Sequence, residues 1–360
     1  MSLQLRYNRR LTAENAIPVG LVGFGIAGRT FHAPVIRAVP GLHLTTIVQR
    51  TGDSAREAYP DVRVVRNLDE LLADESIRLV VVATPNDSHY PLARQCLLAG
   101  RDVVVDKPFT TTSAEAQDLD QLARSKGRLL SAYQNRRWDG DFLTVRKLID
   151  SQVLGRLVLF ESHYDRYRLA RRPGAWRENV GPGSGVLFDI GPHLLDQALV
   201  LFGMPEAINA DVRIERDDAI VDDAFDILLR YPNLRVLLRA TMLASAPGPR
   251  FVLNGTLGSF TNYGFDPQED ALRAGGLPGS PGWGEEDESR WGTLTLAEQN
   301  ATVRRAVRTE AGDYRQFYAN VRDAILGKAA LAVTAEQAIQ VIRMLERAQE
   351  GMRCKSEQPS

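Results

Sequence analysis

The sequence predicts an α/β protein with two domains, a doubly wound parallel sheet in residues 1–134 and a mostly antiparallel sheet in residues 135–360. Three observations support this prediction. Short apolar runs alternate with helix-like segments in the first part, which is the order of a parallel sheet with helical crossovers. A G-x-G-x-x-G turn follows the first run. Beyond residue 207, short strands succeed one another with short turns, which favours antiparallel pairing.

The composition gives bounds on location and partners. Lys and Arg number 44 and Asp and Glu 45, so a net charge of −1 gives no reason to expect nucleic acid or an anionic membrane as partner. No apolar run approaches the roughly 20 residues of a membrane span. We therefore expect a cytoplasmic protein, with residues 1–15 as a loose leader. We expect Cys96 and Cys354 to be inert and no metal to be bound.

The glycine turn carries the clearest motif. The strand-like run Val19–Val22 leads into it, and a helix-like segment follows. This context predicts a dinucleotide site, because the first glycine permits the turn, the second admits a pyrophosphate and the third lets the helix pack on the strand. An ordinary glycine turn is the alternative. The expected binding loop is Gly23, Phe24, Gly25, Ile26, Ala27 and Gly28.

The end of the second strand, Leu42–Val48, bears on the choice of nucleotide. An acidic residue at this point hydrogen-bonds the 2′-hydroxyl of NAD, but this chain has Gln49, Arg50 and Thr51. A guanidinium binds a 2′-phosphate through charge-assisted hydrogen bonds, so we expect Arg50 and Thr51 to bind NADP, with NAD less favoured. Alternatively, Arg50 is a solvated loop residue.

Two later loops also follow strands of the predicted parallel sheet, where ligands of such sheets bind. After Leu79–Ala83 the chain continues Thr84-Pro85-Asn86-Asp87-Ser88-His89, and we expect this loop to contact ribose or phosphate. His89 either contacts the ribose or caps the next helix. After Asp102–Val105 comes Asp106-Lys107-Pro108, which places the Lys107 ammonium at the nicotinamide end of the cleft unless it is a solvated surface charge.

A row of polar residues in an apolar segment marks the second half. If a helix begins near Asp189, with Pro192 in its first turn, then Asp189, His193 and Asp196 share one face. Burying them is costly unless each is paired. The row is either catalytic or a satisfied polar network at a domain interface, and a metal site is a third possibility with too few ligands.

The rest of the chain is expected to form a simple series of elements. Near the domain joint at residues 133–139 the segment is polar and aromatic, as expected of a substrate cleft. We expect helices over residues 113–126, 142–149, 313–326 and 335–350, strands over 157–164, 207–214, 224–231, 236–243, 251–253 and 259–262, and a long loop or lid over 264–292.

Several motifs in order resemble the glucose-fructose oxidoreductase / inositol dehydrogenase family. They are the glycine turn, A-T-P-N-x-x-H, D-K-P after a strand, N-R-R-W-D at the joint and D-I-G-x-H-x-x-D. The longer strings N-R-R-W-D-x-D-F-L-T, L-F-G-M-P and V-T-A-E-Q resemble the branch that holds NADP-dependent scyllo-inositol dehydrogenases. The resemblance implies an N-terminal Rossmann domain, a C-terminal α/β domain with an open, mostly antiparallel sheet, and subunit pairing through that sheet as a homodimer or homotetramer.

The resemblance also implies residue roles. Lys107, Asp189 and His193 match the family's catalytic residues. Asn135, Arg136 and Asp196 match positions that contact polyol hydroxyls. One departure is Asp106, where the family usually has glutamate, which leaves the contacts of this shorter acid open.

The resulting hypothesis is an NADP-dependent oxidoreductase that transfers hydride between NADP and a secondary alcohol of a polyol or sugar, scyllo-inositol-like. An imidazole suits the removal of the hydroxyl proton, and an ammonium suits stabilisation of the alkoxide. The alternatives are an aldose dehydrogenase or ketose reductase of the same family, or a non-catalytic nucleotide-sensing regulator on the same fold.

Overall fold

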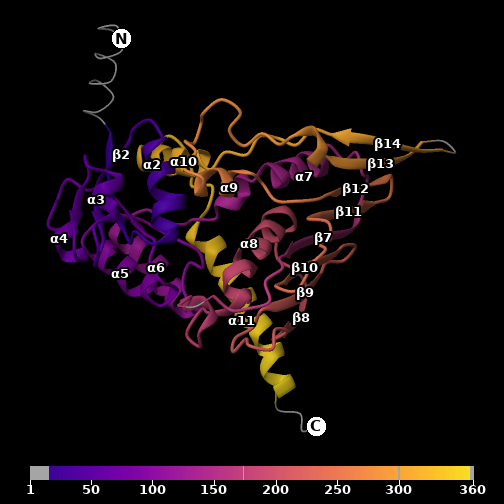
Figure 1. The fold of residues 1–360 in the computed structure, drawn as a ribbon, viewed down its shortest axis with the longest axis horizontal. Coiled ribbons are helices and arrows are strands. Elements are labelled where there is room, and N and C mark those ends of the chain that lie inside the picture. Colours follow the sequence, from indigo (N-terminus) through magenta and orange to yellow (C-terminus); the bar gives the residue numbers. More distant parts are fainter. Residues whose placement is uncertain (1–15, 173, 299–300, 357–360) are drawn as a thin grey trace, which may run out of the picture. The chain divides into compact units, whose positions relative to one another are not determined.

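The computed structural model describes residues 16–172, 174–298 and 301–356, which fall into two compact units (Figure 1). Unit 1 contains residues up to 135 together with 268–283 and 313–339, and unit 2 contains 136–267, 284–312 and the residues from 340 onward. The sequence prediction kept all residues after 134 in one domain, whereas the contacts group two later segments with the first unit. Our predictions for residues 1–15 and for the side chain of Cys354 lie outside what the structure describes.

Unit 1 is built on a six-stranded parallel sheet in the order β3-β2-β1-β4-β5-β6. The order runs outward from the central β1 in both directions, so the predicted doubly wound sheet is confirmed. Every residue of β4 and β5 is buried, as expected of valine runs inside a parallel sheet. The strands are β1 (Ile17–Val22), β2 (Leu42–Val48), β3 (Arg63–Val65), β4 (Leu79–Val82), β5 (Asp102–Val105) and β6 (Leu130–Ala132).

Helices connect these strands. Side chains cap α6 at one end, where Thr112 and Glu115 form a capping box, and Gly127 ends it in the left-handed region at φ 58°. In Figure 1, α5 lies beside α6, and α10 lies beside α2. The helical elements of unit 1 are the π-helical turn η1 (Ala27–His32), α2 (Ala33–Arg37), α3 (Ser54–Ala58), α4 (Leu68–Leu72), η2 (Asn86–Ser88), α5 (His89–Leu98), α6 (Ser113–Lys126), α9 (Gln268–Arg273) and α10 (Arg315–Ile325).

Unit 2 is built on an eight-stranded sheet in the order β14-β13-β12-β11-β7-β10-β9-β8. Only β7 and β10 pair in parallel, so the predicted mostly antiparallel sheet is confirmed. The strands are β7 (Leu157–Asp165), β8 (Ala207–Arg213), β9 (Ala224–Arg230), β10 (Arg235–Thr241), β11 (Phe251–Gly255), β12 (Gly258–Asn262), β13 (Gly292–Glu298) and β14 (Ala301–Val307). The helical elements from the joint onward are η3 (Asn135–Trp138), α7 (Gly140–Asp150), η4 (Trp176–Glu178), α8 (Gly185–Phe202), η5 (Glu288–Arg290) and α11 (Ala335–Ser356).

The sequence prediction missed several elements, among them α3, α9 and the strands β13 and β14. Strand β14 carries little hydrophobic alternation, and most of its side chains are exposed, whereas β13 alternates Thr and Leu over residues 293–296 and was missed although that signal was present. Helix α9 lies within the segment expected to be a loop, and it is too short for a helical period to stand out. The capping of α11, by contrast, is as predicted: Thr334 and Gln337 exchange side chain to backbone hydrogen bonds of 3.2 Å.

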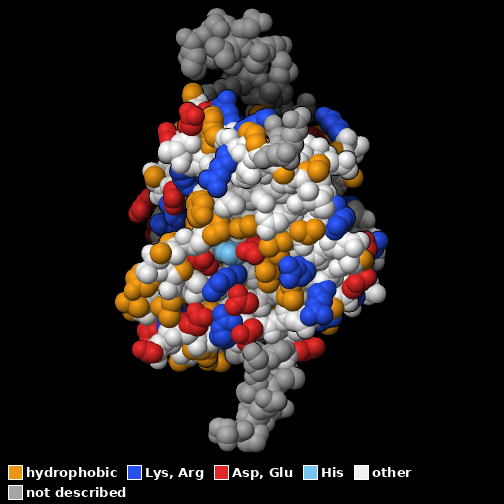
Figure 2. Space-filling model, turned by 90° about the vertical axis from the view of Figure 1, so that its right-hand side faces the viewer, with side chains coloured by type: hydrophobic (Ala, Val, Ile, Leu, Met, Phe, Trp, Pro, Cys, Tyr) orange, Lys and Arg blue, Asp and Glu red, His pale blue; other side chains and the backbone are white. Residues whose placement is uncertain are grey.

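Ion pairs link neighbouring strands at one edge of the unit 2 sheet. Arg213 on β8 contacts Asp226 on β9 at 2.8 Å, and Arg239 on β10 contacts the same carboxylate at 3.5 Å. Figure 2 shows the side of the molecule on which these strands are labelled in Figure 1, with acidic, basic and hydrophobic side chains interspersed. Such mixed charge produces no extended field of one sign on this side.

Helix α8 begins four residues earlier than predicted, at Gly185 rather than near Asp189. Asp222 explains the earlier start, because its backbone oxygen accepts from Val186 N at 2.9 Å and its carboxylate accepts from Leu187 N at 2.6 Å. These bonds satisfy N–H groups that a helix start leaves without partners. Pro192 therefore lies inside the helix and not in its first turn, which corrects our expectation.

By length and hydropathy, α8 meets the test for a membrane-spanning helix, the one such helix among the residues that the structure describes. Yet 72% of that stretch is buried inside the protein, against β9, β10 and neighbouring segments. A core helix passes the same test, and the burial of α8 explains its apolar sequence.

We predict that Asp222 makes stability depend on pH. Burial raises the pKa of Asp222 to about 6, against the opposing hydrogen bond from Leu187. Between about pH 4 and 6 the folded protein then binds a proton that the unfolded chain releases, so the free energy of unfolding falls by about 3 kcal/mol as the pH rises through this window.

Urea unfolding of the wild type and of Asp222→Asn across pH 4–7 checks this prediction. The asparagine retains an acceptor for the helix N–H groups but does not titrate. The difference in the free energy of unfolding between the wild type and the variant should shrink as the pH rises. If the free energies of the two proteins change in parallel with pH, the prediction is contradicted.

Candidate functional site

The three glycines of the turn in unit 1 each meet a different steric requirement. Gly23 has φ +101°, and a Cβ there would lie 2.4 Å from Ala83 O. A Cβ on Gly28 would lie 2.1 Å from Gly23 O. Gly25 is exposed and a Cβ would meet no atom within 4 Å, so at this position the glycine keeps space open outside the protein. These are the conditions that a pyrophosphate-binding turn requires.

The residues between and after these glycines shape the turn. Phe24 is buried and its ring meets Tyr59 edge-on at 6.0 Å, whereas Ile26 is 53% exposed. Ala27 begins the π-helical turn η1, and α2 follows it directly with Pro34 in its first turn. π-Helical turns are rare and often occur at functional sites.

The loop after β2 carries positive charge. Arg50 and Thr51 are exposed, which fits both a contact with a ribose phosphate and the alternative of solvated loop residues. Gln49 caps α3 through its side-chain oxygen at 2.8 Å. The acid of this loop, Asp53, is paired with Arg66 at 2.8 Å. Arg66 also donates to the backbone oxygen of Gln49. Sequence reasoning did not predict Arg66 as a site residue, although its position directly after β3 was an available indication.

The loop after β4 forms the short helix η2. Thr84 is half-buried and its hydroxyl accepts from Ser88 at 2.8 Å. Pro85 is exposed, and Asn86 is buried at 2% exposure. Contact of these residues with a nucleotide stays a prediction.

His89 lies fully buried at the start of α5. Its Nδ1 is 2.8 Å from Pro108 O and its Nε2 is 2.9 Å from Thr84 O. The ring thus ties the loop after β4 to the loop after β5, which is a structural role other than the helix capping that we gave as the alternative. A contact with ribose stays a prediction.

Asp106 and Lys107 lie where β5 ends. Lys107 is half-buried, and its backbone N–H donates to the Asp106 carboxylate at 2.8 Å. Burial acts to raise the pKa of Asp106, but the His32 imidazole 3.6 Å from the carboxylate, with the charges of Lys107 and His89, lowers it to about 2. The shorter acid therefore has identified partners, which the sequence left open.

In unit 2, α8 presents Asp189 and His193. His193 is 4% exposed, so its ring lies inside the protein. Asp189 is half-buried and pairs with Arg177 Nε at 3.2 Å. That arginine was not among the predicted site residues, and the catalytic roles that the resemblance implies for Asp189 and His193 stay predictions.

Arg136 and Asp196, predicted to contact polyol hydroxyls, are held by protein groups. Both oxygens of Asp196 accept from Arg137, at 2.7 and 2.6 Å. Arg136 donates to Tyr164 Oη at 2.9 Å and pairs with Asp139 at 3.2 Å. These contacts match the alternative of a satisfied polar network, and a role in substrate binding stays a prediction.

The same network contains residues that sequence reasoning missed. Gln197 donates to Arg136 O at 2.8 Å and accepts from Arg250 at 3.1 Å. Arg250 also pairs with Asp141 at 3.3 Å, and both side chains are buried. The sequence indication of such network residues was a charged residue next to an apolar run, as Arg250 is before Phe251–Leu253.

The predicted residues belong to different units. The glycine turn, the loops after β2, β4 and β5, and the boundary residue Asn135, which is 5% exposed, belong to unit 1. Asp189, His193 and Asp196 belong to α8 in unit 2. Their convergence with Lys107 on one substrate carbon stays a prediction.

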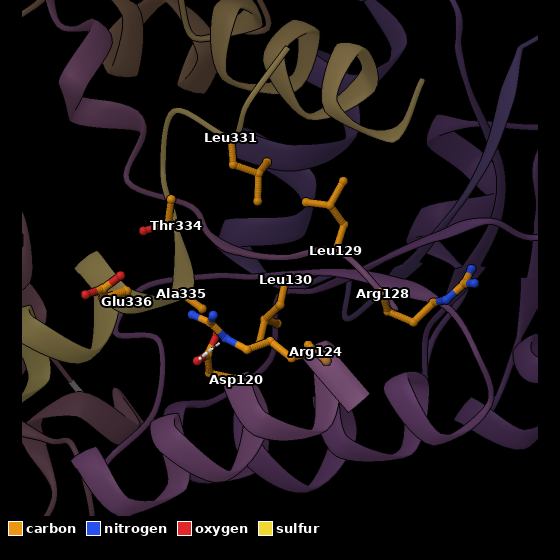
Figure 3. Close-up of a pocket in the computed structure, with 10 residues that line it drawn as sticks. Asp120, Arg124, Arg128, Leu129, Leu130, Leu331, Thr334, Ala335 and Glu336 are labelled. Atoms are coloured by element: carbon orange, nitrogen blue, oxygen red, sulfur yellow. Dashed lines mark hydrogen bonds and ion pairs between the residues drawn. The ribbon is translucent and has the colours of Figure 1, made fainter. Parts of the chain in front are cut away.

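A pocket of about 260 Å³ lies elsewhere in unit 1, between α6, the start of β6 and the N-terminus of α11 (Figure 3). Leu129, Leu130 and Leu331 line it, and Arg124 turns toward Asp120 at 2.8 Å. None of the predicted site residues lines this pocket.

Among the described residues, no group of three or more His, Cys, Asp or Glu side chains is arranged to hold a metal ion. Burial raises the pKa of the Cys96 thiol to about 12, which keeps it unreactive.

We predict that Gly25→Ala separates binding from folding. The methyl group of the alanine would enter open space, so the free energy of unfolding should change by less than about 1 kcal/mol. The affinity for the dinucleotide should fall at least about tenfold, because the methyl group obstructs the phosphates. Gly28→Ala is the control that should destabilise the fold by overlap with Gly23 O. Thermal unfolding and titration with nucleotide measure both effects, and wild-type affinity in Gly25→Ala would contradict the prediction.

Comparisons with known proteins agree with this geometry. The model of an oxidoreductase family with an NAD-binding Rossmann fold matches residues 17–134. The model of the C-terminal alpha/beta domain of that oxidoreductase family matches residues 146–357.

Individual relatives cover nearly the whole chain. The oxidoreductase YdgJ of Escherichia coli is 46% identical over 92% of this chain and 94% of its own. The scyllo-inositol 2-dehydrogenase (NADP(+)) IolW of Bacillus subtilis is 39% identical over 93% of this chain and 94% of its own. The solved structure of the oxidoreductase yvaA from Bacillus subtilis superposes with a TM-score of 0.91 at 38% identity, covering 95% of this chain and 97% of that one. The chain is an oxidoreductase with an NAD(P)-binding Rossmann domain, and it belongs to the glucose-fructose oxidoreductase / inositol dehydrogenase (Gfo/Idh/MocA) family.

Proposed function

We propose that the protein is an NADP-dependent oxidoreductase that transfers hydride between NADP and a secondary alcohol of a polyol or sugar. The observation that carries the proposal is Lys107, a half-buried lysine at the carboxyl end of a fully buried strand in the nucleotide-binding sheet. Ligands of such sheets bind at that edge. The substrate is scyllo-inositol-like, by analogy with the relative named for that activity.

In this proposal each residue has one role. The glycine turn and Arg50 would hold NADP, which would supply the acceptor for the hydride that leaves the alcohol carbon. His193 takes the hydroxyl proton, because an imidazole titrates near neutral pH. Lys107 hydrogen-bonds the same oxygen and stabilises the developing alkoxide. Asp189 favours the protonated imidazole and is itself held by Arg177.

The cofactor proposal rests on the loop after β2. Arg50 is exposed there, and the acid nearby, Asp53, is already paired with Arg66. A carboxylate free to bind a 2′-hydroxyl is thus replaced by guanidinium groups that attract a 2′-phosphate. NAD is the less favoured cofactor.

The remaining proposals follow from the resemblance and the composition. We propose a cytoplasmic homodimer or homotetramer that pairs through the unit 2 sheet and binds neither nucleic acid nor membrane. The mixed charges on that side of the molecule support a protein partner over a polyanion (Figure 2).

The function is tested by nicotinamide absorbance with a panel of inositols, aldoses and ketoses. We expect turnover with a polyol, and Lys107→Met should lower it at least about 100-fold because alkoxide stabilisation is lost. Lys126→Met, an exposed lysine on α6, should leave it unchanged. Near wild-type turnover in Lys107→Met would refute the mechanism, and cofactor binding without turnover on any panel member would favour the nucleotide-sensing regulator.

The cofactor preference is tested by Arg50→Ala. We expect the affinity for NADP to fall about tenfold or more, as charge-assisted hydrogen bonds to a phosphate are lost, with NAD affinity unchanged. Arg56→Ala, on the neighbouring α3, is the control. An unchanged ratio of the two affinities would show that Arg50 does not bind the 2′-phosphate.

A further inference from the structure

A glutamine outside the predicted site lies at the carboxyl end of β6, the last strand of the unit 1 sheet. Gln134 is 2% exposed. Its side-chain oxygen Oε1 is buried and accepts no hydrogen bond from any residue that the structure describes. Buried polar atoms in proteins nearly always have a partner, because one without a partner loses its bonds to water and gains none. A purely structural role does not explain such an atom.

The backbone places Gln134 beside Lys107. Val105 at the end of β5 pairs with Ala132 at the end of β6, and the lysine and the glutamine each come two positions later. Tyr133 N donates to Val105 O at 2.8 Å, so the two strands keep their pairing up to this point. Gln134 N then donates to Ala132 O at 2.9 Å, a tight turn that ends β6. Lys107 and Gln134 thus occupy neighbouring positions at the same edge of the sheet.

The polar side chains that precede Gln134 on this strand have partners within the protein. Ser131 Oγ donates to Val333 O at 2.8 Å, and Tyr133 Oη donates to Phe31 O at 3.0 Å. The hydrogen bonds that hold β6 in the fold are therefore made before the edge is reached. The unpartnered oxygen of Gln134 lies at the edge itself, where ligands of such sheets bind.

This part of the edge belongs to one half of the nucleotide-binding fold. A doubly wound sheet binds a dinucleotide across its edge, with one mononucleotide on each half. The glycine turn after β1 and Arg50 after β2 would hold the pyrophosphate and the adenosine, which leaves the nicotinamide to the half formed by β4, β5 and β6. In the proposed reaction the ring lies against the substrate carbon whose oxygen contacts Lys107. An acceptor that lacks a donor fits this position, because the nicotinamide half brings donors to it.

The donors of that half are the carboxamide NH2 of the ring and the ribose hydroxyls. The ribose lies between the ring and the phosphates, and hence farther from Lys107 than the ring does. We propose that Gln134 Oε1 accepts a hydrogen bond from the carboxamide of the nicotinamide cofactor and so fixes the rotation of the ring about its bond to the ribose. The inference rests on the proposed function for the position of the ring beside Lys107, and it extends that function by adding a residue that orients the cofactor.

The first experiment measures binding and needs no turnover. Each protein is titrated with NADP, with its 3-acetylpyridine analogue, in which a methyl group replaces the carboxamide NH2, and with 2′-phospho-ADP-ribose, which lacks the ring. The same titrations are made in the NAD series. The wild type should bind the analogue at least about fivefold more weakly than the parent dinucleotide, because the buried oxygen is left without a donor.

Gln134→Met removes the acceptor and keeps an unbranched side chain of similar size. The affinity of this variant for the parent dinucleotide should fall about fivefold, and the ratio of its affinities for the parent and the analogue should fall below about twofold. The nucleotide without the ring should bind the variant and the wild type equally. Gln95→Met is the matched control, since Gln95 is an exposed glutamine on α5 and its loss should leave all three affinities at the wild-type values.

The other possible partners of Gln134 give different results. A contact with the ribose would weaken the binding of 2′-phospho-ADP-ribose to Gln134→Met as much as that of the parent. A contact with water or with the substrate would leave the ratio for the parent and the analogue unchanged between the variant and the wild type. Either result would overturn the proposal.

The second experiment tests whether Gln134 serves the fold instead. Without nucleotide, Gln134→Met replaces a buried acceptor that has no partner by an apolar group of similar shape, so the Tm of the variant should equal or exceed that of the wild type. Saturating dinucleotide should raise the Tm of the wild type more than that of the variant, because it binds the wild type more tightly. A variant with a lower Tm than the wild type in the absence of nucleotide would show a structural role and contradict the inference.

The failure of this inference can be told apart from the failure of the proposed function. If Gln134→Met loses the discrimination against the analogue in a protein that turns over no polyol, the role of the glutamine is supported and the function is rejected. Turnover of a polyol with the same affinity ratio in both proteins does the reverse.

Discussion

Burial of the valine-rich strands β4 and β5 is the constraint on which the candidate site in unit 1 depends. Parallel strands buried on both faces must end at the same edge, so the residues that follow them are brought to that edge whatever their own preferences. Thr84 and Asp106 therefore lie where chain direction puts them. The glycine turn after β1 occupies the same edge because β1 pairs with β4. A ligand site arises here from topology first and from side-chain chemistry second.

The parts that sequence could predict are those encoded locally. Apolar runs such as Val80–Val82 give the strands, and the glycine spacing gives a turn whose steric needs the structure bears out. The placement of Lys107 after β5 follows from the same local pattern. The start of α8 could not be predicted this way, because the group that caps it, Asp222, comes 35 residues later than the N–H it accepts from. Without that cap, Pro192 seemed to require a later start.

The polar partners of the site residues were also beyond local reasoning. Arg137 and Asp196 are 59 positions apart, and His32 and Tyr318 are 286 apart. Nothing in the sequence near either member indicates the other. The sequence analysis inferred correctly that the polar row Asp189, His193 and Asp196 on α8 is costly to bury without partners. It did not decide whether those partners are substrate groups or other protein side chains. For Asp196 the structure supplies an internal partner.

The internal pairing changes how the second unit is best understood. Replacing a buried ion pair by apolar groups is often neutral or stabilising, whereas removing one partner costs about 3–5 kcal/mol. Pairs such as Arg137–Asp196 and Arg250–Asp141 are therefore poor explanations of stability. They are better explanations of position, since a bidentate guanidinium fixes both distance and plane.

Gln197 lies one residue beyond Asp196 and links Arg136 to Arg250, so the network fixes the rotation of α8 about its axis. That rotation decides where Asp189 and His193 on the same helix are directed, and the proton transfer that we propose for His193 requires this positioning because such a step tolerates little misplacement.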